Sequence, residues 1–197
     1  MIAEEAKRQR EQLDRYLRWV EEESGVEGPT HLDTWFKPHQ QYRLRWLKRH
    51  CVGTVMELGT CYGYVLAFCG GQIGVDHNEK SIALARILNP KKEFVIADIR
   101  NLPFPDNYTD TVMVCDVLEH IPWEDIPKAL KQARRVAKQK VLITVPDERN
   151  IPDSTCFKHI WLATPEKVEF ITKEFTNDKV TIKRKGGFIL MEVSLNV

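Results

Sequence analysis

The sequence lacks a long hydrophobic run, a surplus of charge of one sign and a regular cysteine pattern, and each absence excludes a class of protein. No stretch approaches the roughly 20 consecutive apolar residues of a transmembrane helix, and the first residues, MIAEEAKRQREQ, contain no apolar core of a secretory signal. The net charge of +1 provides no overall field for holding a polyanion. Five cysteines without a C-x-x-C pair fit neither a zinc knuckle nor a disulfide framework. We therefore expect a cytoplasmic protein with reduced thiols and without membrane or nucleic-acid partners, and the oligomeric state stays open.

What the sequence does contain is the composition of one globular domain. The 197 residues are 43% hydrophobic and 29% charged, which is enough to bury a core. Residues 1–24 and Gln40–Arg49 have helical periodicity, and the stretch between them includes the polar and aromatic HLDTWFKPH. We expect residues 1–50 to form a helical cap or lid and residues 51–197 to form the core.

From residue 52 onward, short apolar runs alternate with helical patterns. The runs are VGTVMEL, QIGVD, EFVIAD, TVMVCD and KVLITVP, and the helical segments between them are EKSIALARILN and EDIPKALKQARRVAK. Strands that are apolar throughout and separated by helices predict a parallel sheet with both faces covered. A helix that starts at Thr164-Pro165-Glu166 follows, and then KVTIKR and FILMEVSL flank Lys185-Gly186-Gly187. The predicted fold class is α/β: a Rossmann-like three-layer sandwich with a mainly parallel sheet, a C-terminal antiparallel β-hairpin and N-terminal capping helices.

Acidic residues and glycines occur where the predicted strands end. Glu57 begins an E-x-G-x-x-x-G turn that leads into a helix, a place where a doubly wound sheet binds ligands. Asp76, Asp98 and Asp116 end the next three predicted strands along the chain. Four acids at one edge would repel one another unless hydrogen-bond donors lie between them, which suggests a ligand. The alternatives are a purely structural turn and an N-cap of the next helix by Asp76 or Asn78.

With these motifs in view, residues 52–175 resemble the class I S-adenosylmethionine-dependent methyltransferases, especially the type 11 small-molecule group. The matching segments are VMELGTCYGY, GVDHNEKSIALAR, ADIRNLPFPDNYTDTV, CDVLEHIP and KHIWLATPEKV, in the family's order and spacing. The resemblance implies S-adenosylmethionine as the cofactor and methyl transfer to an oxygen or nitrogen of a small-molecule acceptor.

The resemblance also implies roles at the methionine end of the cofactor. Backbone groups would cradle the methionine moiety at Gly59, Thr60, Cys61 and Gly63. Glu57 would support this loop from beneath, and Cys115 and Asp116 would lie near the sulfonium. Cys61 stands where the family usually has a glycine, and its side chain narrows the approach of a ligand to the backbone. The helix after this loop, YVLAFC, is short because Gly70-Gly71 follows it.

At the adenosine end, the resemblance implies that Asp76 holds the ribose hydroxyls and that His77 lies against the adenine. Asp98 would accept a hydrogen bond from the adenine amino group, with Ile99 beside the ring.

Two histidines are candidates for the general base, because an imidazole titrates near neutral pH. His120 and His159 both fall in predicted loops at the carboxyl side of the sheet, and each also has a structural interpretation as a hydrogen-bonding or packing residue. We expect no metal, since Asp106 and Asp110 belong to the family's ordinary loop.

Three other functions remain as alternatives. A dinucleotide-dependent oxidoreductase expects G-x-G-x-x-G, which G-T-C-Y-G does not match. A non-catalytic binding or scaffold protein would be consistent with Cys61 and the short helix. An RNA-modifying methyltransferase would use the basic run over 128–140, which a solvated helix face also explains.

Overall fold

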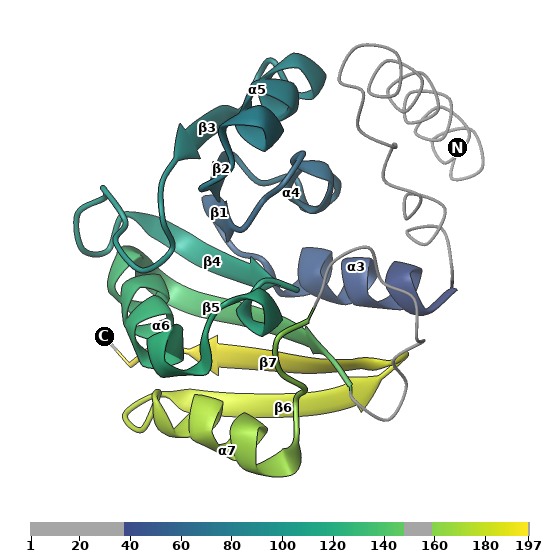
Figure 1. The fold of residues 1–197 in the computed structure, drawn as a ribbon, viewed down its shortest axis with the longest axis vertical. Coiled ribbons are helices and arrows are strands. Elements are labelled where there is room, and N and C mark those ends of the chain that lie inside the picture. The colour runs from purple at the N-terminus through teal and green to yellow at the C-terminus, as the bar shows by residue number, and fades with distance from the viewer. Residues whose placement is uncertain (1–37, 148–158, 197) are drawn as a thin grey trace.

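The computed structural model describes residues 38–147 and 159–196, which form a sheet with helices on both faces (Figure 1). The strands are β1 Val55–Leu58, β2 Ile73–Asp76, β3 Glu93–Ile96, β4 Thr109–Cys115, β5 Ala137–Pro146, β6 Lys179–Lys185 and β7 Phe188–Ser194. The helices are α3 Pro38–His50, α4 Tyr64–Cys69, α5 Glu79–Leu88, α6 Ile126–Val136 and α7 Pro165–Lys173, with 3-10 turns at Leu118–His120 and Trp123–Asp125. The predicted helix over 1–24, most of the aromatic segment that follows it and Cys156 lie outside the described residues.

The seven strands are ordered β3-β2-β1-β4-β5-β7-β6. The first five strands of the chain pair in parallel, and β7 pairs antiparallel with both β5 and β6. The prediction of a mainly parallel sheet with a C-terminal antiparallel pair is therefore confirmed. Because β1 to β4 run in parallel beside one another, their carboxyl ends lie at one edge of the sheet, where the loops that follow them gather.

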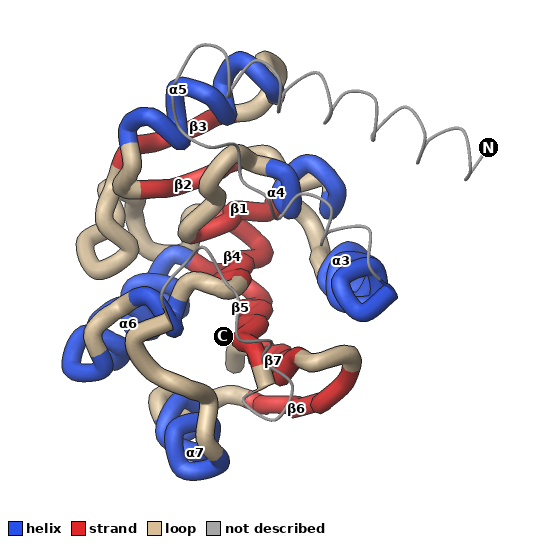
Figure 2. Tube along the Cα trace, turned by 45° about the vertical axis from the view of Figure 1, so that its right-hand side comes forward, coloured by secondary structure: helices blue, strands red, loops and turns tan. Residues whose placement is uncertain are grey.

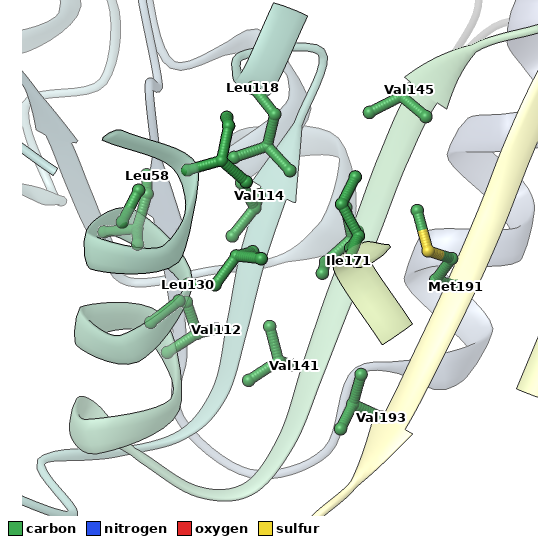
Figure 3. Packing of buried hydrophobic residues seen from close by; sticks show 14 of the residues in the cluster. Leu58, Val112, Val114, Leu118, Leu130, Val141, Val145, Ile171, Met191 and Val193 are labelled. Atoms are coloured by element: carbon green, nitrogen blue, oxygen red, sulfur yellow. The ribbon is translucent and has the colours of Figure 1, made fainter. Parts of the chain in front are cut away.

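The two faces of the sheet carry separate hydrophobic clusters. On one face α6 and α7 pack on strand residues such as Val112, Val141 and Met191 (Figure 3). On the other face α3, α4 and α5 pack on Met113, Leu142 and neighbouring residues, so the helices form two outer layers around the sheet (Figure 2). Successive side chains of a strand point to opposite faces, and this explains why these strands are apolar at nearly every position.

Local signals fix several helix ends as the sequence predicted. Asn78 caps α5 by accepting from the backbone N–H groups of Lys80 and Ser81, and Thr164 caps α7 with Pro165 in its first turn. Helix α4 has only 6 residues and ends at Gly70, which adopts φ 77°, so the short helix is confirmed. None of the helices in 38–147 and 159–196 has the length and apolar character needed to cross a membrane.

Helix α3 belongs to the packed body of the molecule. It buries Leu44, Trp46 and Leu47 in the same cluster as α4 and the middle of the sheet. The remainder of the predicted cap, residues 1–37, lies outside the described residues, so the division into a cap and a core stays a prediction.

Candidate functional site

The loop after β1 forms the centre of the site. Gly59 has a φ of 71°, and a Cβ atom there would come within 2.4 Å of the Val117 side chain. The backbone N–H groups of Gly59 and Thr60 both donate to the Val75 carbonyl, at 2.8 and 2.9 Å. Only glycine suits a position that combines a left-handed conformation with no space for a side chain. The loop therefore lies close to both the end of β2 and the segment after β4.

Glu57 lies beneath this loop with its side chain buried. One carboxylate oxygen accepts from the Thr60 hydroxyl at 2.7 Å and from the Leu66 backbone N–H at 2.9 Å. Burial raises the pKa of Glu57 to about 8, although these two hydrogen bonds oppose the shift. Glu57 thus connects the loop to the first turn of α4.

Cys61 adopts the conformation expected of the glycine that it replaces. Its φ is 49°, in the left-handed region that side chains disfavour. Burial, and then the charge of Asp76, raises the pKa of the thiol to about 12, so Cys61 is a neutral thiol at physiological pH. Its backbone N–H donates to Asp76 at 2.8 Å.

Asp76 lies at the carboxyl end of β2 with 12% of its side chain exposed. One carboxylate oxygen accepts from Cys61, and the other accepts from the backbone N–H of Asn78 at 2.9 Å. Since each oxygen has two lone pairs, Asp76 keeps acceptor capacity for a ligand. His77 is 86% exposed, and its Nδ1 lies 3.6 Å from Asp76.

Asp98 lies just beyond β3 and is held by Arg100. The guanidinium donates to both carboxylate oxygens, with contacts between 2.6 and 3.0 Å, and it also reaches Asp125. These hydrogen bonds from Arg100 lower the pKa of Asp98 to about 2. The neighbouring Ile99 packs against the cluster beneath α6. Sequence reasoning missed Arg100, although its place two residues after a strand-end aspartate is a readable signal.

Asp116 receives the side chain of Arg43, which crosses from α3 to the end of β4. Arg43 is fully buried, donates to Asp116 and to the Thr144 hydroxyl, and places its guanidinium 4.8 Å from the centre of the Phe188 ring. Thr144 also donates to Asp116 at 2.8 Å. Sequence reasoning missed Arg43. Its position four residues before Leu47 places it on the apolar side of the helix, and a charged residue there is a sign of a buried ion pair.

The chain itself therefore supplies donors to all four acids at this edge. The repulsion between the acids, which the sequence offered as a sign of a bound ligand, is relieved by protein groups at Glu57, Asp76, Asp98 and Asp116. Glu57 and Asp76 lie close enough for the charge of Asp76 to raise the pKa of Glu57. This is consistent with the prediction that the acids gather at one edge of the sheet. The charge pattern alone thus carries no conclusion about a ligand.

Two separate segments bring His120 and His159 together beyond β4. Their ring centroids are 5.1 Å apart in an edge-to-face arrangement. Backbone N–H of Ile160 donates to the Glu119 carbonyl at 2.9 Å, and Trp161 donates from its indole to the Ile121 carbonyl at 3.0 Å. The segment after β5 is thereby fastened to the segment after β4. Cys115, by contrast, packs in the cluster beneath α3 and α4 and exposes little surface.

The sequence of this chain is similar to sequences of known methyltransferases. Residues 56–145 match the family model described as a methyltransferase domain. A probable S-adenosylmethionine-dependent methyltransferase of Mycobacterium tuberculosis is 31% identical over 121 residues, which cover 59% of this chain and 43% of that protein. The chain therefore spans less than half the length of this relative.

Two solved structures share the fold. One is an S-adenosylmethionine-dependent methyltransferase of Thermotoga maritima, described as a possible histamine N-methyltransferase, with a TM-score of 0.64, 18% identity and coverage of 91% of this chain and 97% of the other. The second is the magnesium protoporphyrin IX methyltransferase of Synechocystis with bound S-adenosylmethionine, with a TM-score of 0.59, 16% identity and coverage of 79% and 77%. Residues 56–145 therefore match a methyltransferase domain, and the chain shares the fold of these solved methyltransferases.

Proposed function

We propose that this protein is an S-adenosylmethionine-dependent methyltransferase that transfers a methyl group to an oxygen or nitrogen of a small-molecule acceptor. The observation that carries the proposal is the glycine loop over Glu57, with Asp76 beside it at the end of the next strand. The family match covers this segment.

The residues at this edge fit the cofactor chemically. Gly59 lets the loop turn in a left-handed conformation and pack against the Val117 side chain, which fills the space that a Cβ would take. Asp76 offers two partly used carboxylate oxygens to a ribose diol. Asp98 is ionised at neutral pH, because Arg100 lowers its pKa to about 2, so it is an acceptor for an amino group. Cys61 fits as well, because its neutral thiol brings no charge into the loop.

When bound, S-adenosylmethionine supplies an electrophilic methyl group, so the chain has to bind, align and shield the reactants. In the proposal, the backbone at Gly59 to Gly63 orients the methionine moiety, and Glu57 keeps that loop in place. Asp76 anchors the ribose, while His77 and Ile99 flank the adenine. Arg43 holds Asp116 in a fixed position at the end of β4. His120 or His159 takes the proton of the acceptor.

Binding of S-adenosylhomocysteine tests the cofactor half of the site. We expect Asp76→Ala to weaken binding by about 1.5–3 kcal/mol, the scale of lost charge-assisted hydrogen bonds. Asp106→Ala is the matched control, because Asp106 lies in the loop before β4, where it pairs with Arg135 of α6. Calorimetry of both variants, with unfolding curves to verify that they fold, separates the two aspartates. An unchanged dissociation constant for Asp76→Ala would contradict the ribose role, and no heat with the parent protein would contradict the proposal.

The small-molecule acceptor is supported by the near-neutral charge and by the small-molecule names of two structural relatives. The basic run of α6 gives little support to a nucleic acid, because Arg134 pairs with Asp178 and Arg135 pairs with Asp106.

RNA as the acceptor is favoured by a different surface. Exposed Arg49 of α3 and Lys183 of β6 line one shallow depression, and Lys185 lies beside it over the ring of Tyr42. A radiolabelled methyl assay decides between the two acceptors: label in low-mass products of a metabolite extract supports the proposal, and label in bulk RNA supports the alternative. The absence of any methyl transfer by a protein that binds S-adenosylhomocysteine would instead support a non-catalytic binding protein.

We also propose that the protein acts in the cytoplasm. The cysteines of the described residues, Cys51, Cys61, Cys69 and Cys115, are free thiols, which is the form that reducing compartments maintain.

A further inference from the structure

Glu119 presents a buried carboxylate at the carboxyl edge of the sheet. The residue is 2% exposed, and neither carboxylate oxygen has a hydrogen-bond partner from another residue in the described parts of the chain. A buried carboxyl group without a partner costs free energy, so the position calls for a functional explanation.

Two imidazoles lie beside this carboxylate. Glu119, His120 and His159 each offer one ligand atom, and these three atoms lie within 4.8 Å of one another. The three residues come from two segments that Ile160 fastens together through its hydrogen bond to the Glu119 carbonyl. The rings of His120 and His159 lie edge to face, with their centroids 5.1 Å apart.

We propose that Glu119, His120 and His159 bind a divalent transition-metal cation, with zinc as the best match. Two imidazoles and one carboxylate are a ligand set that zinc uses in catalytic sites, where a fourth position stays open. Ligand atoms around one zinc ion lie roughly 3.3 Å apart, given metal–ligand distances of about 2.0–2.2 Å. The three atoms, now within 4.8 Å of one another, would have to approach by roughly 1.5 Å at most to surround one ion.

The neighbouring charges agree with a cation at this position. Asp116 contributes a negative charge near Glu119, and Arg43 contributes a positive one. Arg43 donates to Asp116 at the end of β4 and to Thr144 of β5, so its charge is already paired with Asp116. A divalent ion would compensate the buried carboxylate of Glu119.

The open position of the ion would face the loops at the carboxyl edge. There it would take an oxygen-bearing acceptor, and this assignment rests on the proposed function, whereas the ion site itself does not. If an ion is bound there, Glu119, His120 and His159 would hold it, the ion would supply Lewis-acid polarisation of the acceptor oxygen, and the proton of the acceptor would pass to solvent in place of an imidazole.

The test uses the full chain freed of metal with a chelator, and then titrated with Zn²⁺ or Co²⁺ alone. We expect one equivalent of Zn²⁺ by calorimetry, visible absorption bands of four- or five-coordinate Co²⁺, and a rise of roughly 5–10 °C in the unfolding midpoint at 100-fold excess over Kd. Glu119→Gln and His159→Gln should each weaken binding by roughly tenfold or more. His50→Ala is the matched control and should bind the ion like the parent, because His50 contacts Trp46 on α3.

Folding and cofactor binding are followed separately. Glu119→Gln removes a buried carboxyl group without a partner, so without ion its unfolding midpoint should be no lower than that of the parent. His159→Gln, at a half-buried position, provides the second variant. The absence of one-equivalent binding, or binding that both variants retain, would overturn the proposal. S-adenosylhomocysteine calorimetry on the metal-free protein reports the proposed function independently.

Discussion

At the scale of single residues, Cys61 adopts a backbone conformation that favours glycine. With φ at 49°, a β-branched side chain would clash most strongly with the backbone, while glycine would not clash. We expect Cys61→Val to lower the free energy of unfolding by about 1–2 kcal/mol relative to Cys61→Gly. Urea unfolding of the two variants measures the difference. Equal stabilities would show that the left-handed conformation carries no cost here.

Glu57 should make the stability depend on pH in an unusual direction. Its pKa is about 8 in the folded chain and near 4.5 in an unfolded one, so the folded state holds the proton more tightly. The contribution is complete below pH 4.5 and is lost as the pH rises toward 8, by up to about 1.4 kcal/mol per pH unit.

Glu57→Gln removes this titration, while its amide oxygen can still accept from Thr60 and Leu66. We expect the parent to lose roughly 2 kcal/mol more than the variant between pH 6 and pH 8. Urea unfolding at both pH values measures the two losses. Parallel pH dependences in parent and variant would mean that Glu57 ionises normally.

The residues that the sequence could and could not predict differ in the range of their contacts. Asp76 and Gly59 follow apolar runs directly, so their places at strand ends could be read locally, and the family resemblance added roles that stay proposals. Arg43 reaches Asp116 across 73 positions of the chain, and no periodicity reports such a contact. The pairing of His120 with His159 likewise depends on how two loops meet.

At the scale of secondary-structure elements, α3 is tied to the sheet by an ion pair as well as by packing. Arg43→Met should preserve much of the packing over Phe188 but leave Asp116 without its cation. We expect a loss of about 2–4 kcal/mol, below the upper end for fully buried pairs because Asp116 is partly exposed. Adding Asp116→Asn should restore part of the loss. Chemical unfolding of the single and double variants measures it.

The control for the Arg43 and Asp116 variants is Arg45→Met, on the exposed side of the same helix. We expect it to change the stability by less than about 0.5 kcal/mol. If Arg43→Met behaved like Arg45→Met, the pair would not contribute to holding α3 on the sheet.

Elements were more predictable than their arrangement. Most described strands of the core coincide with apolar runs, because both faces of the sheet are covered there. Strand β6 is exposed at nearly every position and was predicted from the glycine pair that joins it to β7. The order of the strands is not encoded in that pattern, because it follows from the crossovers between strands, and no order was predicted from the sequence. Helix α3 was expected as part of a cap. A basic amphipathic helix has the same pattern of apolar and charged residues whether it covers a sheet or a ligand.

At the scale of the whole molecule, the sheet joins two hydrophobic clusters into one cooperative unit. Neighbouring residues of β5 divide between them: Ile143 packs beneath α6 and α7, and Leu142 packs beneath α3 and α4. Since both side chains are fully buried on the same strand, neither cluster can loosen without disturbing the hydrogen bonds that β5 makes to β4 and β7. The clusters should therefore unfold together.

Trp161 and Trp46 report on the two clusters separately, since Trp161 lies in the first and Trp46 in the second. In two variants that each retain only one of these tryptophans, with phenylalanine at the other tryptophan positions, fluorescence and circular dichroism should give one coincident urea midpoint within each variant. Leu142→Ala and Ile143→Ala should each lower that midpoint by the equivalent of about 2–5 kcal/mol, whichever tryptophan is observed. If the two clusters are coupled through β5, a mutation on one face must also shift the urea midpoint reported by the tryptophan on the opposite face. A mutation that shifted only the midpoint reported by the tryptophan on its own face would show that the two faces of the sheet unfold independently.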